Sequence, residues 1–233
     1  MIVALFQGTV PAVVEPAQVP VPYSWSVIGG MFLVGITGGI GAGKSQALCE
    51  FQTFGVRVLD ADAVVHELYG TDSGLRAALL ERWGLAVLGA DGQVDRAAVA
   101  RRVFGAATER EWLNQQVHPL VKRRILQDAE ESSSGLFCAI PLLFEVQWEP
   151  AMTCTVAVWC DPQSQRKRLR GRGWSDPEIA QRTASQMSMD EKLARADFGI
   201  LNIGSLRLLR VQCRQVFERI MEYHGPGREA HRG

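Results

Sequence analysis

The sequence predicts an α/β fold in which a parallel β-sheet is flanked by helices. Short apolar runs alternate with longer stretches of helical periodicity, which is typical of parallel strands joined by crossover helices. Several of the short runs are apolar at nearly every position, as expected for strands that are buried on both faces. The first run leads directly into a glycine-rich loop and then into a helical stretch.

The expected elements follow from these patterns in chain order. FLVGIT is the first strand, a helix from about Lys44 to Phe54 follows the glycine loop, and GVRVLDAD is the second strand. Residues 63–131 contain four helical patterns and no obvious strand, so we expect a helical insertion there. LFCAIPLLFE and CTVAVWCD are two further strand candidates, and each ends where polar residues begin.

Composition bounds the class of protein. A chain of 233 residues with 47% apolar content can bury a real core, which argues against disorder. Lys plus Arg and Asp plus Glu both number 25, so the charge balance gives no sign of a general nucleic-acid binder or a membrane-surface protein. The 5 cysteines form no C-x-x-C pair and lie mostly in apolar runs, so we expect reduced core residues of a cytoplasmic protein. The 4 histidines form no i,i+4 pair, which argues against a zinc site.

The two ends of the chain are expected to lie outside the folded domain. Residues 1–30 are apolar but interrupted by prolines, with Glu15 as their one charged residue, so neither a regular core element nor a membrane-spanning helix fits. A secretory signal would need a basic start, and no Lys or Arg precedes Lys44. We expect residues 1–30 to be a flexible appendage or an over-extended gene start. Residues 31–224 form the predicted domain, and 225–233 a flexible tail.

A nucleotide-binding loop is the most specific motif. Residues 38–45 fit the pattern G-x-x-x-x-G-K-[ST] between a predicted strand and a predicted helix, which is the context the motif requires. Glycines let successive backbone N–H groups converge on an anion, and the helix N-terminus adds partial positive charge. Lys44 is expected to reach the β- and γ-phosphates, and the Ser45 hydroxyl is expected to ligate Mg²⁺. The motif therefore predicts binding of a nucleoside triphosphate with Mg²⁺, rather than a glycine turn that binds nothing.

Two carboxylates, Asp60 and Asp62, end the second predicted strand. In open α/β sheets the ligand crevice lies outside the carboxyl ends of the strands, so this pair is expected to face the phosphate loop. One carboxylate would then accept or position the proton of an acceptor hydroxyl, and the other would organise Mg²⁺ through its water. The alternative is an ordinary strand-to-helix turn, in which Asp62 caps a helix that starts near Ala63.

A basic cluster lies in the second half of a chain whose net charge is zero. It contains Arg166, Lys167, Arg168, Arg170, Arg172 and Arg182. Arg168 and Arg172 are four residues apart and are expected to share one helix face, and Ser175 with Glu178 forms a capping box for a following helix. Two arginine-bearing helices around a glycine hinge suit a lid, residues 165–186, that closes over phosphates and excludes water. The alternatives are a solvated face and a nucleic-acid patch.

Other users of the phosphate loop fit the sequence less well. Guanine-specific switch proteins normally carry an N-K-x-D element, which is absent from the sequence. Motor ATPases usually end a strand with Asp-Glu, whereas the corresponding candidate here is CAIPLLFE. These differences favour phosphate transfer to a small acceptor.

Taken together, the motifs resemble the dephospho-CoA kinase family. The resemblance covers roughly residues 31–222 and rests on TGGIGAGKS, LDAD, HPL, PLLFE and ADFGILNIGS, the last of which is similar to the family pattern A-D-x-x-I-x-N-x-G. It implies a P-loop kinase sheet with a lid and with residues 63–131 as a helical insertion on the substrate side. It also implies transfer of the ATP γ-phosphate to the ribose 3′-hydroxyl of dephospho-CoA, which gives CoA and ADP in the last step of CoA biosynthesis.

The resemblance implies roles for individual residues on the nucleotide side. Lys44 would stabilise charge on the phosphates, Asp62 would be the catalytic base and Arg172 the lid arginine. The expected nucleotide contacts are Thr37, Gly39, Gly41, Ala42, Gly43, Lys44, Ser45, Gln46 and Asn202. Of these, Asn202 is expected near the adenine.

On the acceptor side, the resemblance implies contacts from Asp62, His66, His118, Leu142 and Leu143, with the two leucines lining the cleft wall. On the residues alone, His118 before Pro119 is equally a helix-kink residue satisfied in the core. Two positions depart from the family. His66 stands where the family commonly has arginine, which makes its contact with the acceptor weaker and dependent on pH. Gln46 replaces the usual threonine after Ser45, with little expected effect because Ser45 supplies the Mg²⁺ ligand.

The sequence therefore predicts an ATP-dependent phosphotransferase with an alcohol acceptor, dephospho-CoA, and with no nucleic-acid or membrane partner. One alternative is another P-loop nucleotide or small-molecule kinase. The other is a nucleotide-binding switch or nucleic-acid-dependent ATPase that uses the basic cluster as its partner surface.

Overall fold

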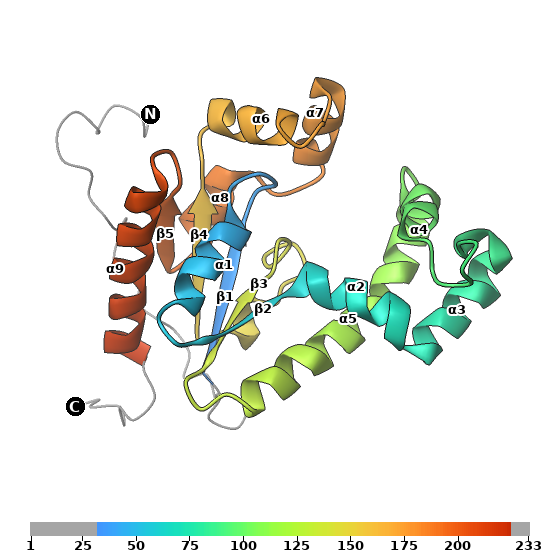
Figure 1. Cartoon of the computed structure of the whole chain (residues 1–233), viewed down its shortest axis with the longest axis horizontal. Helices are drawn as coiled ribbons and strands as arrows, with labels where there is room; N and C mark the ends of the chain where they lie inside the picture. The colour runs from blue at the N-terminus through green and yellow to red at the C-terminus, as the bar shows by residue number, and fades with distance from the viewer. Residues whose placement is uncertain (1–31, 225–233) are drawn as a thin grey trace. The chain divides into compact units, whose positions relative to one another are not determined.

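A computed structural model of the protein describes residues 32–224, so the expectations for residues 1–30 and 225–233 lie outside the described part. The chain divides into two compact units. The sheet unit comprises the described parts of residues 1–58 and 132–233, and the helical unit comprises Leu59–Glu131. Figure 1 shows the elements of both units in chain order.

The helices and strands are β1 (Leu33–Gly38), α1 (Lys44–Gln52), β2 (Arg57–Asp60), α2 (Ala61–Thr71), α3 (Ser73–Trp83), a 3₁₀ helix (Gly84–Val87), α4 (Arg96–Val103), α5 (Ala107–Glu130), β3 (Leu136–Ala139), a 3₁₀ helix (Glu149–Ala151), β4 (Cys154–Trp159), α6 (Pro162–Arg170), α7 (Asp176–Ala184), α8 (Met189–Arg195), β5 (Phe198–Leu201) and α9 (Leu206–His224).

The sheet has five strands in the order β2-β3-β1-β4-β5. β1 pairs in parallel with β3 on one side and with β4 on the other, and β4 pairs in parallel with β5. Every residue of β1 and β3 is buried, as expected for strands with both faces covered. The predicted α/β fold with a parallel sheet is therefore confirmed.

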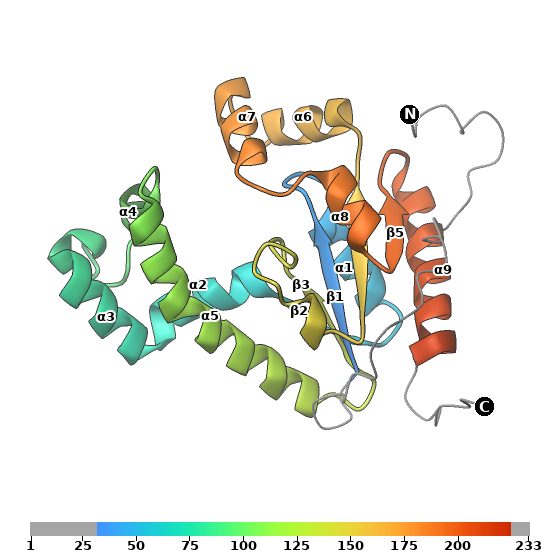
Figure 2. The same cartoon turned by 180° about the vertical axis from the view of Figure 1, so that it is seen from behind.

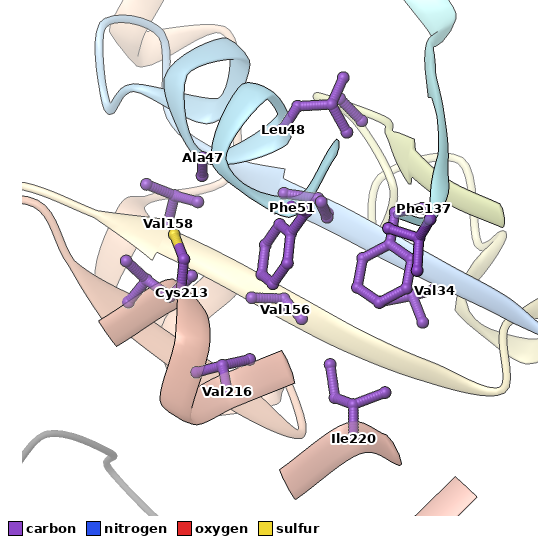
Figure 3. Packing of buried hydrophobic residues seen from close by; sticks show 14 of the residues in the cluster. Val34, Ala47, Leu48, Phe51, Phe137, Val156, Val158, Cys213, Val216 and Ile220 are labelled. Carbon is purple, nitrogen blue, oxygen red and sulfur yellow. The ribbon is translucent and has the colours of Figure 1, made fainter. Parts of the chain in front are cut away.

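One face of the sheet packs against α1 and α9. Figure 3 shows Phe51 of α1, Phe137 of β3 and Ile220 of α9 in the same apolar cluster. Val156 and Val158 of β4 point into this cluster because alternate residues of a strand face the same side of the sheet. The phosphate loop is therefore anchored at the strand before it and at the helix after it.

The opposite face packs against α8. Ala157 of β4, which lies between Val156 and Val158, belongs to a second cluster with Phe144 and Ala196. Figures 1 and 2 show α1 and α8 on opposite sides of the central strands. The small Ala157 side chain lets α8 approach the sheet closely.

The segment LFCAIPLLFE departs from the expected strand. β3 ends at Ala139, and residues 141–147 form successive turns. The last bond to β1 runs from the Ile140 N–H to the Ile36 carbonyl, and Pro141 has no N–H with which to continue the ladder. Leu143 and Phe144, which are buried, join the core from a turn and not from a strand.

The cysteines also depart in part from expectation. None of the five described cysteines is in a disulfide, and Cys138, Cys154, Cys160 and Cys213 are buried. Cys49 is exposed, so its assignment to the core was wrong. It lies on the outer side of α1, between the buried residues Leu48 and Glu50.

In the helical unit, the four expected helical patterns are confirmed as α2, α3, α4 and α5. Glu109 of α5 accepts hydrogen bonds from Arg82 and from the Trp83 indole of α3, the latter at 2.7 Å. Arg124 of α5 pairs with Glu67 of α2 at 3.0 Å. These contacts tie α2 and α3 to the long helix α5.

Candidate active site

The phosphate loop, residues 38–45, connects β1 directly to α1, as the motif predicts. α1 begins at Lys44, and Gly43 is its N-cap with a φ of 104° in the left-handed region that favours glycine. A β-carbon at Gly43 would overlap the side-chain nitrogen of Asn202. Backbone geometry and packing therefore both restrict this position to glycine.

The Lys44 side chain folds back over the start of the phosphate loop. Its Nζ donates to the carbonyl oxygens of Gly38 at 2.8 Å and Gly39 at 3.1 Å. The side chain is half-buried, so the ammonium is held close to the first residues of the loop. A fixed positive charge at this place suits an anionic ligand.

Three further expected nucleotide contacts differ in their surroundings. Thr37 is fully buried, and its hydroxyl donates to the Pro141 carbonyl at 3.2 Å. Ser45 is exposed in the first turn of α1. Gln46 is also exposed, and its amide lies 3.3 Å from the Glu50 carboxylate of the next turn.

The carbonyl groups of the loop are covered by side chains from α6. Gln165 donates its side-chain amide to the Ile40 carbonyl at 2.8 Å. Arg168 donates from Nη1 to the carbonyls of Gly41 at 3.3 Å and Ala42 at 3.1 Å. Sequence reasoning placed Arg168 in the basic cluster but did not foresee that it contacts the loop backbone.

Asn202, directly after β5, covers the loop from another side. Its side-chain Nδ2 donates to the Ala42 carbonyl at 2.8 Å, and its own carbonyl accepts from Arg168 Nη2 at 2.7 Å. Asn202 is 8% exposed, so most of its surface is covered by other parts of the protein. The expected contact of Asn202 with adenine stays a prediction.

The segment predicted to be a lid, residues 165–186, includes most of α6 and all of α7, with a short turn between them (Figure 1). The capping box of Ser175 and Glu178 is confirmed at the start of α7. The expectation that Arg168 and Arg172 share one helix face was wrong. α6 ends at Arg170, and Arg172 lies exposed in the turn that follows.

Two other arginines of the cluster have partners within the lid. Arg170 makes two hydrogen bonds of 2.8 and 2.6 Å to Asp176 across the turn. The Arg182 guanidinium lies 4.3 Å from the centre of the Trp174 ring, in a cation–π contact. Both groups of the Arg170–Asp176 pair are largely exposed, so the pair fixes the turn more than it adds stability.

A cavity of about 620 Å³ lies next to the loop within the sheet unit. Gly39 and Ile40, the end of β4 at Trp159, the lid helices and the N-terminus of α8 line it. The Trp159 indole donates to Asp190 of α8 at 2.7 Å. The loop and the helices α6 and α7 thus line the same open cavity.

The carboxylate pair lies at the start of the helical unit. Asp60 is the N-cap of α2, and its carboxylate accepts from the Asp62 N–H at 2.9 Å. The helix begins at Ala61, so the alternative in which Asp62 caps a helix from Ala63 was wrong. Asp62 lies in the first turn with an exposed side chain.

Two histidines of the helical unit were expected on the acceptor side. His66 is exposed on α2, one turn after Asp62. His118 is half-buried within α5, where Pro119 leaves the helix continuous. Burial lowers the pKa of His118, because the charged imidazolium loses its hydration.

The two leucines after β3 differ in exposure. Leu142 is 37% exposed, whereas Leu143 has no exposed surface. Of the two, only Leu142 therefore presents its side chain at the surface. Leu143 packs instead near Gly35 of β1 in the core.

Lys192, a buried lysine of α8, contacts the turns that follow β3. This contact was not predicted from the sequence. Lys192 has no exposed surface, and its Nζ donates to the Pro141 carbonyl and lies 2.8 Å from Glu145 Oε1. Glu145 also accepts from the Met187 N–H at 2.9 Å. Burial lowers the pKa of Lys192, although the Glu145 carboxylate opposes the shift. Lys192 stands in an ordinary helical pattern, which gives no sign of these partners.

Within residues 32–224, no three His, Cys, Asp or Glu side chains gather into a group that could hold a metal ion. In the same part of the chain, no helix combines the length and the apolar character needed to cross a membrane.

Known proteins resemble this chain over most of its length. The model of the dephospho-CoA kinase family matches residues 32–207. The dephospho-CoA kinase of Symbiobacterium thermophilum is 37% identical over 187 residues, which span 78% of this chain and 78% of that protein. The enzyme of the same name from Shewanella oneidensis is 34% identical over 196 residues, or 83% of this chain and 96% of that protein.

Solved structures share the fold of this chain. A crystal structure from Thermus thermophilus aligns with a TM-score of 0.72 at 32% identity and covers 82% of this chain and 98% of that one. A dephospho-CoA kinase from Campylobacter jejuni aligns with a TM-score of 0.60 at 24% identity over 82% of this chain and 97% of that one, a likeness of fold. The resemblance drawn from the motifs is therefore confirmed, and the chain belongs to the dephospho-CoA kinase family.

Proposed function

We propose that this chain transfers the γ-phosphate of ATP to the ribose 3′-hydroxyl of dephospho-CoA and releases CoA and ADP. The observation that carries the proposal is the phosphate loop between β1 and α1, with the Lys44 ammonium held at the Gly38 and Gly39 carbonyls. Membership of the family supplies the acceptor. The 3′-oxygen forms a bond to the γ-phosphorus while the bond from that phosphorus to the β–γ bridging oxygen breaks. ADP carries that oxygen away, and the hydroxyl proton passes to a base.

On the nucleotide side, the loop N–H groups and Lys44 bind and orient the triphosphate. The residues also fit Mg²⁺, which needs only one or two protein oxygens when phosphates and waters complete its shell. Ser45 presents such an oxygen, exposed in the first turn of α1. When bound, Mg²⁺ supplies neutralisation of charge on the phosphates. Thr37 contacts the phosphates, and Asn202 contacts the adenine.

On the acceptor side, Asp62 accepts or positions the proton of the 3′-hydroxyl. Two observations support this role. The N-cap of α2 is supplied by Asp60, so capping does not explain the Asp62 side chain, and that side chain is exposed. His66 and His118 of the same unit bind the rest of the acceptor. Leu142, in the sheet unit, is a further proposed contact of the acceptor.

The lid brings Arg172 to the transferred phosphate. Its exposed place in the turn between α6 and α7 suits a group that moves toward the ligand as the lid closes. A guanidinium there stabilises negative charge that develops in the transition state. The Arg170–Asp176 pair keeps the turn in shape while it moves.

We also infer that the protein works in the cytoplasm. Its five cysteines are not joined in disulfides in the described residues, which suits a reducing compartment.

The test is an ADP-release assay with purified protein, Mg-ATP and dephospho-CoA, run beside adenosine, AMP and dTMP as alternative acceptors. We expect turnover only with dephospho-CoA, and CoA as the second product. Turnover with another acceptor would identify a different small-molecule kinase. Hydrolysis stimulated by nucleic acid and weakened by salt would favour a nucleic-acid-dependent ATPase.

A further inference from the structure

We propose that Arg168 is a positioning residue that holds the phosphate loop in its ATP-binding shape from the carbonyl side. The inference rests on the proposed function of the loop as the ATP site. It assigns the residue a role through the loop backbone, not through the ligand.

The argument begins with the geometry of a backbone that binds an anion. When successive N–H groups converge on a phosphate, the carbonyl groups of the same peptides point away from it. Those carbonyls need partners of their own, since an unpaired polar group in a protein interior is costly. The loop therefore depends on donors that lie behind it.

These donors are present at three consecutive residues of the loop. The Ile40 carbonyl accepts from Gln165, the Gly41 carbonyl from Arg168, and the Ala42 carbonyl from both Arg168 and Asn202. Ala42 itself has no exposed surface, so water cannot easily replace these donors.

Arg168 joins three parts of the chain that are far apart in sequence. Its Nη1 donates to two carbonyls of the loop, and its Nη2 donates to the carbonyl of Asn202 after β5. Its own backbone belongs to α6. A planar guanidinium presents several N–H donors in a fixed fork, which a lysine cannot reproduce. The donors seen here face carbonyl groups, which is the arrangement of a support and not of a phosphate ligand.

The helix that carries Arg168 also carries Gln165, three residues earlier and on the same helix face. Both side chains donate to the loop, so this face of α6 is fixed against it. The first helix of the lid is therefore joined to the loop.

The test compares Arg168→Ala with Lys167→Ala, which removes the same charge from the neighbouring position of α6. Lys167 is exposed, so this variant measures the effect of charge alone. Binding of Mg-ATP and of inorganic triphosphate with Mg²⁺ is measured by competition against a fluorescent ATP analogue. Inorganic triphosphate shares the phosphates of ATP and has no base or ribose.

We expect Arg168→Ala to weaken the binding of both ligands by the same factor, about 10- to 100-fold. The change removes two charge-assisted hydrogen bonds to the loop and a third to the Asn202 carbonyl. Lys167→Ala should have a smaller effect, and the KM for dephospho-CoA should stay unchanged in both variants. A loss of ATP binding with normal triphosphate binding would overturn the inference, since Arg168 would then contact the base or the ribose. Equal affinity in the variant and the parent protein would overturn it as well.

The parent protein separates this inference from the proposed function. If the parent does not bind ATP, the proposed function itself fails. If it binds ATP but triphosphate does not compete, the loop is not the main source of affinity, and the role of Arg168 is rejected.

Two milder variants guard against loss of the fold. Arg168→Lys keeps the charge but not the fork, and Gln165→Ala removes one hydrogen bond to the loop. Each variant should bind ATP and triphosphate more weakly by the same factor, and that factor should be smaller than for Arg168→Ala. The melting temperature of each variant should stay near that of the parent protein. Normal affinity for both ligands in both variants would count against the proposal.

Discussion

The side-chain nitrogen of Asn202 occupies the space that a β-carbon on Gly43 would need. A hydrogen bond of 2.8 Å to the Ala42 carbonyl holds that nitrogen in place. Gly43 of the phosphate loop thus leaves space for the side chain of Asn202, which follows β5 and is far away in sequence. The motif requires glycine for its backbone angles, and the fold requires it a second time for packing.

Gly43→Ala should therefore abolish detectable ATP binding. The left-handed φ of 104° strains any other residue by about 1–3 kcal/mol, and the overlap with Asn202 adds to that strain. Affinity for Mg-ATP, measured by calorimetric titration, should fall at least about 100-fold if both costs act on the loop.

The matched control for this prediction is Gly55→Ala. Gly55 also has a left-handed φ of 85°, but a β-carbon there would meet no atom within 4 Å. We expect a loss of about 1 kcal/mol in the free energy of unfolding and unchanged affinity for ATP. Equal losses of affinity in the two variants would show that backbone strain in general, and not the loop, is responsible.

Lys44→Ala should remove turnover and keep the fold. The Lys44 ammonium lies on the Gly38 and Gly39 carbonyls, where it can move onto a bound phosphate. Loss of one fixed charge at the transferred group costs about 10²- to 10³-fold in kcat. Steady-state kinetics with dephospho-CoA and a circular dichroism spectrum check both parts. Normal turnover in this variant would remove the phosphate-loop assignment.

Much of the nucleotide site could be predicted because its signals are local. The glycine loop, the strand before it and the helix after it are adjacent in sequence, and each carries its own pattern. β4 was predictable for a similar reason, because a strand buried on both faces is apolar throughout. The capping box of Ser175 and Glu178 is likewise read from residues three apart.

Other parts could not be predicted because they depend on distant contacts. The run after Ala139 is as apolar as a strand, and only the missing N–H of Pro141 and the packing of Leu143 make it a turn. β5 is a run of four residues, too short to be told from part of a helix by pattern alone. The charge of Arg168 suggested phosphate, whereas its contacts with the loop carbonyls appear only in the fold.

Asp62→Asn should lower kcat far more than it changes the KM for ATP. Loss of a general base costs about 10²- to 10⁴-fold in rate, while the phosphate loop that binds ATP is untouched. Steady-state kinetics with both substrates varied provide the measurement. Equal effects on kcat and on ATP affinity would point to a structural role.

Asp60→Ala is the matched control for Asp62. It removes the N-cap of α2 and should cost about 1 kcal/mol in the free energy of unfolding. Asp60→Asn should restore that stability, because asparagine caps a helix about as well as aspartate. If Asp60→Asn loses as much turnover as Asp62→Asn, the catalytic base is not assigned to Asp62 alone.

Lys192→Met should destabilise the protein without any direct effect on the phosphate loop. The change removes the donor to the Pro141 carbonyl and leaves the Glu145 carboxylate without its ammonium partner. Breaking a buried ion pair on one side costs about 3 kcal/mol or more in the free energy of unfolding. Denaturation by urea gives the value.

A double-mutant cycle isolates the pair. Lys192→Met with Glu145→Gln should recover part of the loss, with a coupling free energy of about 1–3 kcal/mol. Arg170→Met provides the comparison, because Arg170 and Asp176 are each 59% exposed and should contribute below about 1 kcal/mol. Additive effects of the Lys192 and Glu145 changes would contradict the assigned contact.

His118 should make the free energy of unfolding fall as the pH is lowered. Burial places the pKa of His118 below its ordinary value of 6.5 in the folded state, while the unfolded chain takes up the proton near 6.5. Between these two values the unfolded state binds more protons, so stability decreases as the pH falls through that window and is unaffected above it. Urea denaturation is measured between about pH 7.5 and about pH 5, a range that brackets the ordinary histidine pKa. Over this range the free energy of unfolding should decline less steeply for His118→Asn than for the parent protein, because asparagine gains no proton. Carboxylates contribute equally to both proteins, so the difference between the two slopes belongs to His118. Parallel slopes would mean that the imidazole takes up its proton as easily in the folded protein as in the unfolded chain.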